Sequence, residues 1–168
     1  MAHLVITIGC EYGAKGNMIG RKVAKDLGIK FYDRDTVDKI IKEVGIPKDI
    51  MEKVEEGGTI AGKGAEGDVR GSFSKYADLT QRAIHVQKTI IRKLADRESC
   101  VIIGRSADYI LKDNPHCYNV FLFADIKKKL EFCLKQYKEA HDVALDKMSQ
   151  FDKKRSEHYL HYTGKNIE

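Results

Sequence analysis

The chain has 168 residues, 42% hydrophobic and 33% charged, and its 30 Lys and Arg against 25 Asp and Glu give a formal net charge of +5. This length and composition fit one globular domain, 1–168, with a real hydrophobic core. So mild a basic excess suits anionic ligands as well as nucleic acid. Because no strand combines basic and aromatic residues for single-strand binding, nucleic acid is not an expected partner.

The sequence shows no targeting signal and no metal-binding motif. No apolar stretch approaches the roughly 20 residues that cross a bilayer, and no basic and apolar leader precedes a cleavage site. We therefore expect a cytoplasmic protein with no membrane partner. The cysteines form no Cys-x-x-Cys pair, and the closest histidines, His158 and His161, favour packing over metal binding. No metal site built from protein side chains is expected.

The predicted elements alternate between strands and helices. Strands are expected at 4–8, 29–32, 100–103 and 120–123. Helices are expected at 19–27, 36–44 (capped by Asp35), 76–94, 125–137 (capped by Asp125) and 143–162. A glycine-rich segment, 57–72, has few apolar residues and is predicted to be mobile. Continuous apolar strands separated by helices predict a three-layer α/β/α fold around a parallel sheet.

The first strand leads directly into a glycine-rich turn and a helix. This order makes a concave set of backbone N–H groups suited to phosphate, and Lys15 adds a positive charge. Relative to the spacing Gly-x-x-x-x-Gly-Lys-Ser/Thr, Ala14 replaces the second glycine and Gly16 replaces the hydroxyl residue. The alternative is a tight turn with a solvated lysine. The residues predicted to bind a nucleotide here are Gly9, Gly13, Ala14, Lys15, Gly16 and Asn17.

Polar residues also follow the second and third predicted strands. Because ligands of parallel sheets bind beyond the carboxyl ends of the strands, these residues are expected to converge with the first loop. Each has a simpler alternative role in helix capping, ion pairing or turn formation. The residues predicted to bind a second, phosphorylated substrate are Asp33, Arg34, Gly104, Arg105, Ser106 and Asp108.

Three blocks of the chain resemble the cytidylate kinase-like family of P-loop proteins. The first is ITIGCEYG at 6–13, with IGRK at 19–22 and FYDR at 31–34; the second is VIIGRSADYIL at 101–111. The third is DKKR at 152–155, followed by Tyr159, Tyr162, Thr163 and Gly164. The likeness covers most of the chain except 57–71, and the blocks occur in the family's order.

The resemblance implies a nucleoside monophosphate kinase fold with a helical lid, here 138–162, and transfer of the ATP γ-phosphoryl group to CMP or dCMP with Mg²⁺. Position by position, residues 13–16 would hold the donor phosphates and Asp33 and Arg105 would face the acceptor. Asp152 and Arg155 would belong to the lid, where Asp152 would bind the substrate. The catalytic cations would be Lys15, Lys153 and Arg155. Ser106 stands where cytidylate kinases carry an aspartate, so the acceptor base stays open. A non-catalytic nucleotide-binding or regulatory protein is the alternative.

Overall fold

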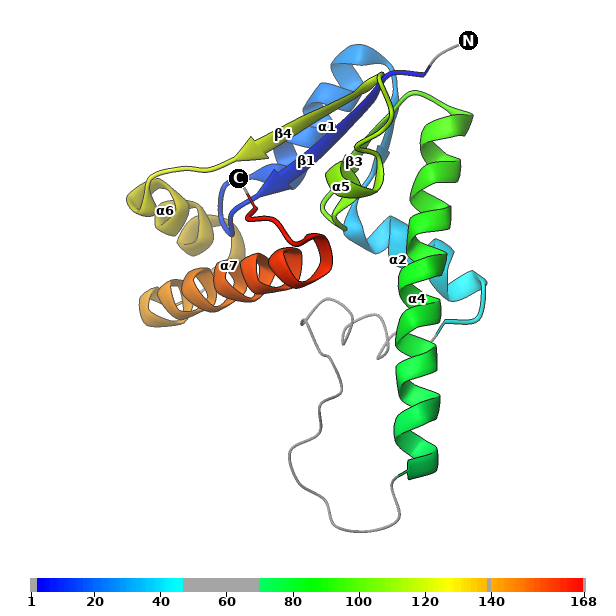
Figure 1. The fold of residues 1–168 in the computed structure, drawn as a ribbon. Helices are drawn as coiled ribbons and strands as arrows, with labels where there is room; N and C mark the ends of the chain where they lie inside the picture. The colour runs from blue at the N-terminus through cyan, green and yellow to red at the C-terminus, as the bar shows by residue number, and fades with distance from the viewer. Residues whose placement is uncertain (1–2, 47–69, 139, 168) are drawn as a thin grey trace.

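The structure is a computed structural model that describes residues 3–46, 70–138 and 140–167. Over these ranges it forms a four-stranded parallel sheet with helices on both faces (Figure 1). The strands are β1 (Val5–Cys10), β2 (Lys30–Tyr32), β3 (Cys100–Ile103) and β4 (Cys117–Leu122). The helices are α1 (Gly16–Leu27), α2 (Arg34–Glu43), α4 (Arg70–Arg97), α5 (Ala107–Ile110), α6 (Ile126–Tyr137) and α7 (His141–Thr163).

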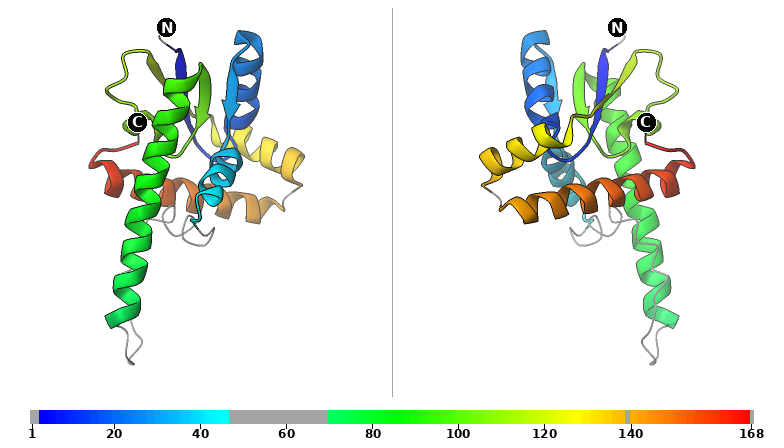
Figure 2. Two further views of the ribbon diagram at one scale, coloured as in Figure 1. Left: turned by 90° about the vertical axis from the view of Figure 1, so that its right-hand side faces the viewer. Right: turned by 90° about the vertical axis from the view of Figure 1, so that its left-hand side faces the viewer.

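The strand order is β2-β3-β1-β4, and every pair is parallel. Successive residues of β3 face opposite sides, as the pleat of a strand requires. Cys100 and Ile102 pack in one cluster with residues of α4 and α5, whereas Val101 and Ile103 pack in another with Ala24 of α1. Figure 2 shows α1 and α4 on opposite faces of the sheet. The predicted three-layer α/β/α architecture is confirmed.

The outer strand β4 departs from the predicted pattern. It runs from Cys117 to Leu122, not over 120–123, and much of it is exposed, including Tyr118 at 63% and Val120 at 41%. The sequence predicted a parallel sheet covered by helices, and β3, in which every residue is buried, fits that prediction. Because β4 lies at an edge and pairs only with β1, it has fewer neighbours to cover it.

Several helix boundaries also differ from prediction. Asp33, not Asp35, caps α2. Its Oδ1 accepts the Thr36 N–H at 2.9 Å, and the helix begins at Arg34, directly after Asp33. The long helix begins at Arg70, so residues 70–72 of the glycine-rich segment are helical, and 57–69 lie outside the described residues. The four-residue helix α5 was not predicted, because it is too short to show a helical period.

The C-terminal helix α7 lies beyond the carboxyl ends of the strands and runs across them (Figure 1). It packs on α6 through a small cluster formed by Cys133, Ala144 and Met148. Both helices are within the predicted range to about one turn. In the described part of the chain, no helix combines the length and the apolar character needed to cross a membrane. The position of α7 makes it one wall of the cavity described next.

Candidate functional site

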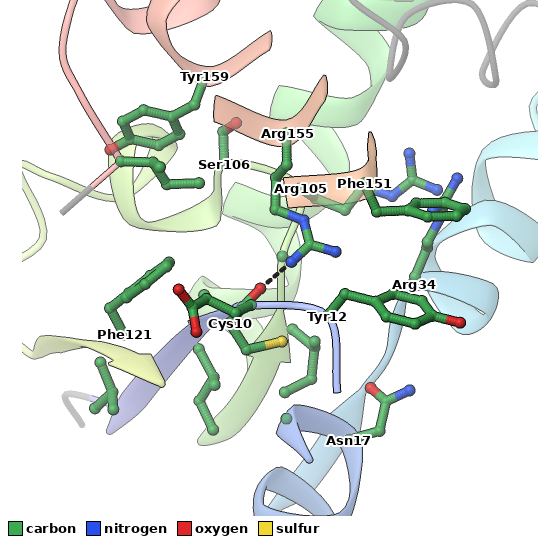
Figure 3. Close-up of a pocket in the computed structure, with 18 of the residues that line it drawn as sticks. Cys10, Tyr12, Asn17, Arg34, Arg105, Ser106, Phe121, Phe151, Arg155 and Tyr159 are labelled. Atoms are coloured by element: carbon green, nitrogen blue, oxygen red, sulfur yellow. Dashed lines mark hydrogen bonds between the residues drawn. The ribbon is translucent and has the colours of Figure 1, made fainter. Parts of the chain in front are cut away.

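A cavity of about 530 Å³ opens where the strands end (Figure 3). Its walls come from β1 and the turn after it, the start of α2, the turn after β3, β4, α6 and α7. Segments far apart in the sequence therefore meet at one place, as ligand sites of parallel sheets do. The predicted residues that line it are Gly9, Gly13, Lys15, Gly16, Asn17, Arg34, Gly104, Arg105, Ser106, Asp108 and Arg155.

The turn between β1 and α1, residues 11–15, is called the phosphate loop below, after the phosphate binding that its sequence predicts. Gly13 has φ 81°, and a Cβ there would lie 3.0 Å from the carbonyl oxygen of Lys129, so only glycine fits. Lys15 also has positive φ, 64°, and its Nζ lies 5.4 Å from the centre of the Phe132 ring. The loop thus brings a lysine and the N-terminus of α1 to the cavity, an arrangement suited to anions.

Backbone N–H groups in and next to the phosphate loop have partners within the protein. The Tyr12 N–H donates to Asp152 Oδ1 at 2.7 Å, and the Ala14 N–H donates to the Glu11 carbonyl at 3.1 Å. The Gly16 N–H donates to the Cys10 thiol, although burial outweighs this bond and raises the pKa of Cys10. Arg155 donates to the Cys10 carbonyl (Figure 3). Residues of α7 therefore stabilise the conformation of the loop.

Three arginines from three elements approach one another in the cavity: Arg34, Arg105 and Arg155 (Figure 3). Burial lowers the pKa of Arg34, and the neighbouring charges of Arg105 and Arg155 lower it further. The side chain of Arg105 is only 2% exposed and pairs with Asp38 of α2; burial lowers its pKa and Asp38 opposes that effect. Neighbouring guanidinium groups carry like charges and repel each other, and the negative charge of a bound phosphate would offset the repulsion.

The turn after β3 holds Arg105 in an unusual conformation. Gly104, Arg105 and Ser106 have φ of 68°, 59° and 50°. Left-handed backbone costs energy in residues other than glycine, and neighbouring contacts must hold it. Gln87 of α4 supplies one, since its Nε2 donates to the Arg105 carbonyl at 3.3 Å. The adjoining Asp108 accepts a hydrogen bond from the Tyr159 hydroxyl.

Helix α7 presents one face to the cavity, and Lys153 is not on it. The face consists of Phe151, Lys154, Arg155, His158 and Tyr159, the spacing of one helical stripe. Lys153 is 75% exposed and its Nζ lies 3.9 Å from Glu157. The prediction that Lys153 is a catalytic cation therefore lacks support from the geometry, because a residue two positions before Arg155 points away from Arg155's side of the helix.

Three other predicted site residues lie outside the lining of the cavity. Asp33 caps α2 and its Oδ2 accepts from Arg21 at 2.6 Å. Burial alone would raise the pKa of Asp33, but the hydrogen bonds from Thr36 and the charge of Arg21 lower it. Asp152 supports the loop backbone, and Ala14 is buried at 7% exposure. These residues therefore support the backbone around the cavity without lining it.

Several lining residues were not predicted. They are Glu11, Tyr12, Gln87, Asn119, Phe121, Phe132, Tyr137, Phe151, Lys154, His158 and Tyr159, among others. Tyr12 and Phe151 stack with their ring centres 5.2 Å apart, although they lie at opposite ends of the chain. The helical period of α7 could have suggested that Phe151, Lys154 and His158 share a face with Arg155. For Gln87 and Phe121, the sequence gives no comparable signal.

Comparison with known proteins agrees with this architecture and site. The model of the cytidylate kinase-like family matches residues 5–168. The chain therefore belongs to the cytidylate kinase-like family. Membership in this family supports a nucleotide kinase-like function. A comparison with curated proteins gives no match.

The solved structures that are similar to this chain include the following two proteins. One is an uncharacterized protein from Eubacterium ventriosum ATCC 27560, with 27% identity and a TM-score of 0.72 over 98% of this chain and 82% of that protein. The other is a gluconokinase from Sinorhizobium meliloti 1021, with 16% identity and a TM-score of 0.49 over 89% of this chain and 75% of that protein. The first similarity covers nearly the whole α/β fold described above.

Proposed function

We propose that the protein transfers the γ-phosphoryl group of ATP to a nucleoside monophosphate, with CMP or dCMP as the favoured acceptor. One observation carries this proposal: Lys15 of the phosphate loop and the arginines Arg34, Arg105 and Arg155 line the same cavity. Phosphoryl transfer needs positioned phosphates and neutralised charge rather than an activated side-chain nucleophile. The phosphate loop would position the donor phosphates and the arginines would position the acceptor phosphate. Their positive charges would neutralise the charge on both.

The proposed roles follow from where each cation lies. The phosphate loop, with Lys15, holds the donor phosphates. Arg34 and Arg105, at the ends of β2 and β3, bind the acceptor phosphate. Arg155 reaches between the two sides from α7, within the proposed lid, and neutralises the charge that develops on the transferred group. Its partner is the Cys10 carbonyl, and it exchanges that partner for a phosphate oxygen when substrates bind.

Mg²⁺ is the expected metal of this reaction, and the chain fits it as a nucleotide-bound ion. Among the described residues, no cluster of three or more His, Cys, Asp or Glu side chains could hold a metal by itself. Mg²⁺ commonly binds through substrate phosphates and water with few protein ligands. Asn17, at the start of α1, lines the cavity and could bind a water of such an ion (Figure 3). The ion would neutralise phosphate charge.

The second candidate function is that of a protein that binds a nucleotide without catalysing phosphoryl transfer. Its supporting observation is that Asp152 accepts a hydrogen bond from the phosphate loop backbone and Arg155 donates one to the Cys10 carbonyl next to the loop, which would suit a protein that holds a nucleotide and signals its presence. A coupled assay of ADP release, with ATP and a panel of nucleoside monophosphates, separates the two. Turnover that depends on CMP or dCMP supports the kinase. Nucleotide binding in calorimetry without turnover on any acceptor supports the alternative.

A further inference from the structure

Lys129 of α6 is a buried cation beside the phosphate loop. Its side chain is 10% exposed, whereas that of the preceding Lys128 is 76% exposed. The Lys129 Nζ lies 3.0 Å from Glu11 Oε2 and 3.6 Å from Asp152 Oδ2. A buried ammonium group is costly unless carboxylates compensate it, and two of them do so here from different segments of the chain.

Both carboxylates also bind backbone N–H groups. Asp152 Oδ1 accepts the Tyr12 N–H at 2.7 Å, and Glu11 Oε2 accepts the Ala124 N–H at 3.3 Å. The backbone of Lys129 touches the loop as well, since a Cβ on Gly13 would lie 3.0 Å from its carbonyl oxygen. Lys129 therefore meets the loop through both its side chain and its main chain, and links it to α7.

The charges explain why a cation is needed at this position. Glu11 lines the cavity and Asp152 lies directly behind the loop. Two uncompensated carboxylates there would repel a polyphosphate. Lys129 does not line the cavity itself, so it can neutralise both without competing for the ligand.

We propose that Lys129 is a positioning residue for the donor nucleotide: it holds the phosphate loop to α7 and cancels the charges of Glu11 and Asp152. The proposal rests on the proposed function only in taking the ligand of the loop to be ATP. It assigns Lys129 an effect on donor affinity, with little effect on the acceptor, because its contacts lie on the phosphate loop side of the cavity.

The test compares ATP binding by the unchanged chain, Lys129→Gln, Lys129→Arg and the matched control Lys128→Gln, in calorimetry without an acceptor. Lys129→Gln should raise the Kd for ATP about tenfold, and Lys129→Arg should recover most of the loss. Lys128→Gln should leave the Kd within about twofold, because its pair with Asp125 is exposed. In kinetic assays, the KM for the monophosphate should change less than that for ATP.

The double variant Glu11→Gln/Lys129→Gln separates charge from folding. It removes a carboxylate along with the cation, so it should bind ATP more tightly than Lys129→Gln alone, and it remains available if the single variant does not fold. Equal ATP affinity in Lys129→Gln and the unchanged chain, or equal effects on donor and acceptor, would overturn the positioning role. Failure of the proposed function appears differently, as an unchanged chain that binds ATP without turnover; a chain that does not bind ATP overturns both.

Discussion

The phosphate loop and the acceptor side of the same cavity are held by different kinds of contact. At the loop, the Tyr12 N–H and the Cys10 carbonyl bond to side chains of Asp152 and Arg155, about 140 positions away in the chain. On the acceptor side, Asp33 caps the helix that follows it, a contact over three positions. The conformation of the loop thus depends on α7 being in place, whereas the start of α2 is fixed locally.

This difference bears on how the enzyme would work. The loop backbone is hydrogen-bonded to Asp152 of α7, so its conformation should change if α7 moves. If α7 acts as the proposed lid, its position and donor binding are therefore expected to be coupled. The acceptor arginines have supports on the body of the domain, such as Asp38 for Arg105. Substitutions on the two sides should therefore affect donor and acceptor kinetics separately.

The largest effect is expected at the loop. Lys15→Ala should lower kcat with ATP by about 10²-fold or more, because it removes the positive charge that Lys15 is proposed to place beside the donor phosphates. The charge on those phosphates changes in the transition state. Steady-state kinetics with saturating acceptor would measure this. Lys22→Ala is the matched control, since Lys22 lies on α1, the helix that follows the loop, and its side chain is 76% exposed and pairs with Asp26. An unchanged kcat/KM for ATP in Lys15→Ala would remove Lys15 from the donor site.

On the acceptor side, Arg34→Ala should raise the KM for the monophosphate by about tenfold, the loss expected for a hydrogen bond between charged groups. The KM for ATP should stay within about twofold, because Arg34 is proposed to bind the acceptor phosphate and the phosphate loop to bind the donor. Lys42→Ala, at the other end of α2, is the control. Equal increases for both substrates would show that the two sides of the cavity are not separate.

The local contact at Asp33 should affect stability. Asp33→Ala should lower the free energy of unfolding at neutral pH by about 1–2 kcal/mol, because it removes the cap of α2 and the partner of Arg21. The pKa of Asp33 is lowered in the folded protein, so its charged form stabilises above the ordinary value of 3.8 and this contribution is lost as the pH falls below it. Urea unfolding at pH 7 and pH 3 should show the gap between the two proteins narrowing. Asp33→Asn should lose less, since asparagine also caps helices; a gap independent of pH would contradict the ion pair.

The sequence predicts best what short-range patterns determine. The apolar run at 100–103 predicted β3 without error, and Lys15, in the predicted turn from β1 into α1, lines the cavity. For α2, the predicted cap was Asp35, but aspartate is favoured as a cap at either position, and Asp33 is the one that accepts the Thr36 N–H.

The long-range contacts could not be predicted in the same way. Nothing near Asp152 in the sequence indicates that its partner is the Tyr12 N–H, because tertiary packing alone brings α7 to the loop. Without knowing what α7 packs against, the basic residues at 153–155 cannot be assigned to its buried or exposed side. That is why Lys153 was predicted at the site and Lys154 was not.

The smallest effect is expected at Lys153, and it tests which face of α7 meets the ligand. Lys153→Ala should leave kcat and both KM values within about twofold, because the side chain is exposed and pairs only weakly with Glu157. Lys154→Ala, one position further on, removes a cation from the lining of the cavity and should raise the KM for ATP several-fold. The two variants lose the same charge from the same helix, so a difference between them reflects position rather than net charge. A larger loss in Lys153→Ala than in Lys154→Ala would mean that α7 turns a different face to the substrates during the reaction, and that the contacts of Asp152 and Arg155 with the loop are broken in that state.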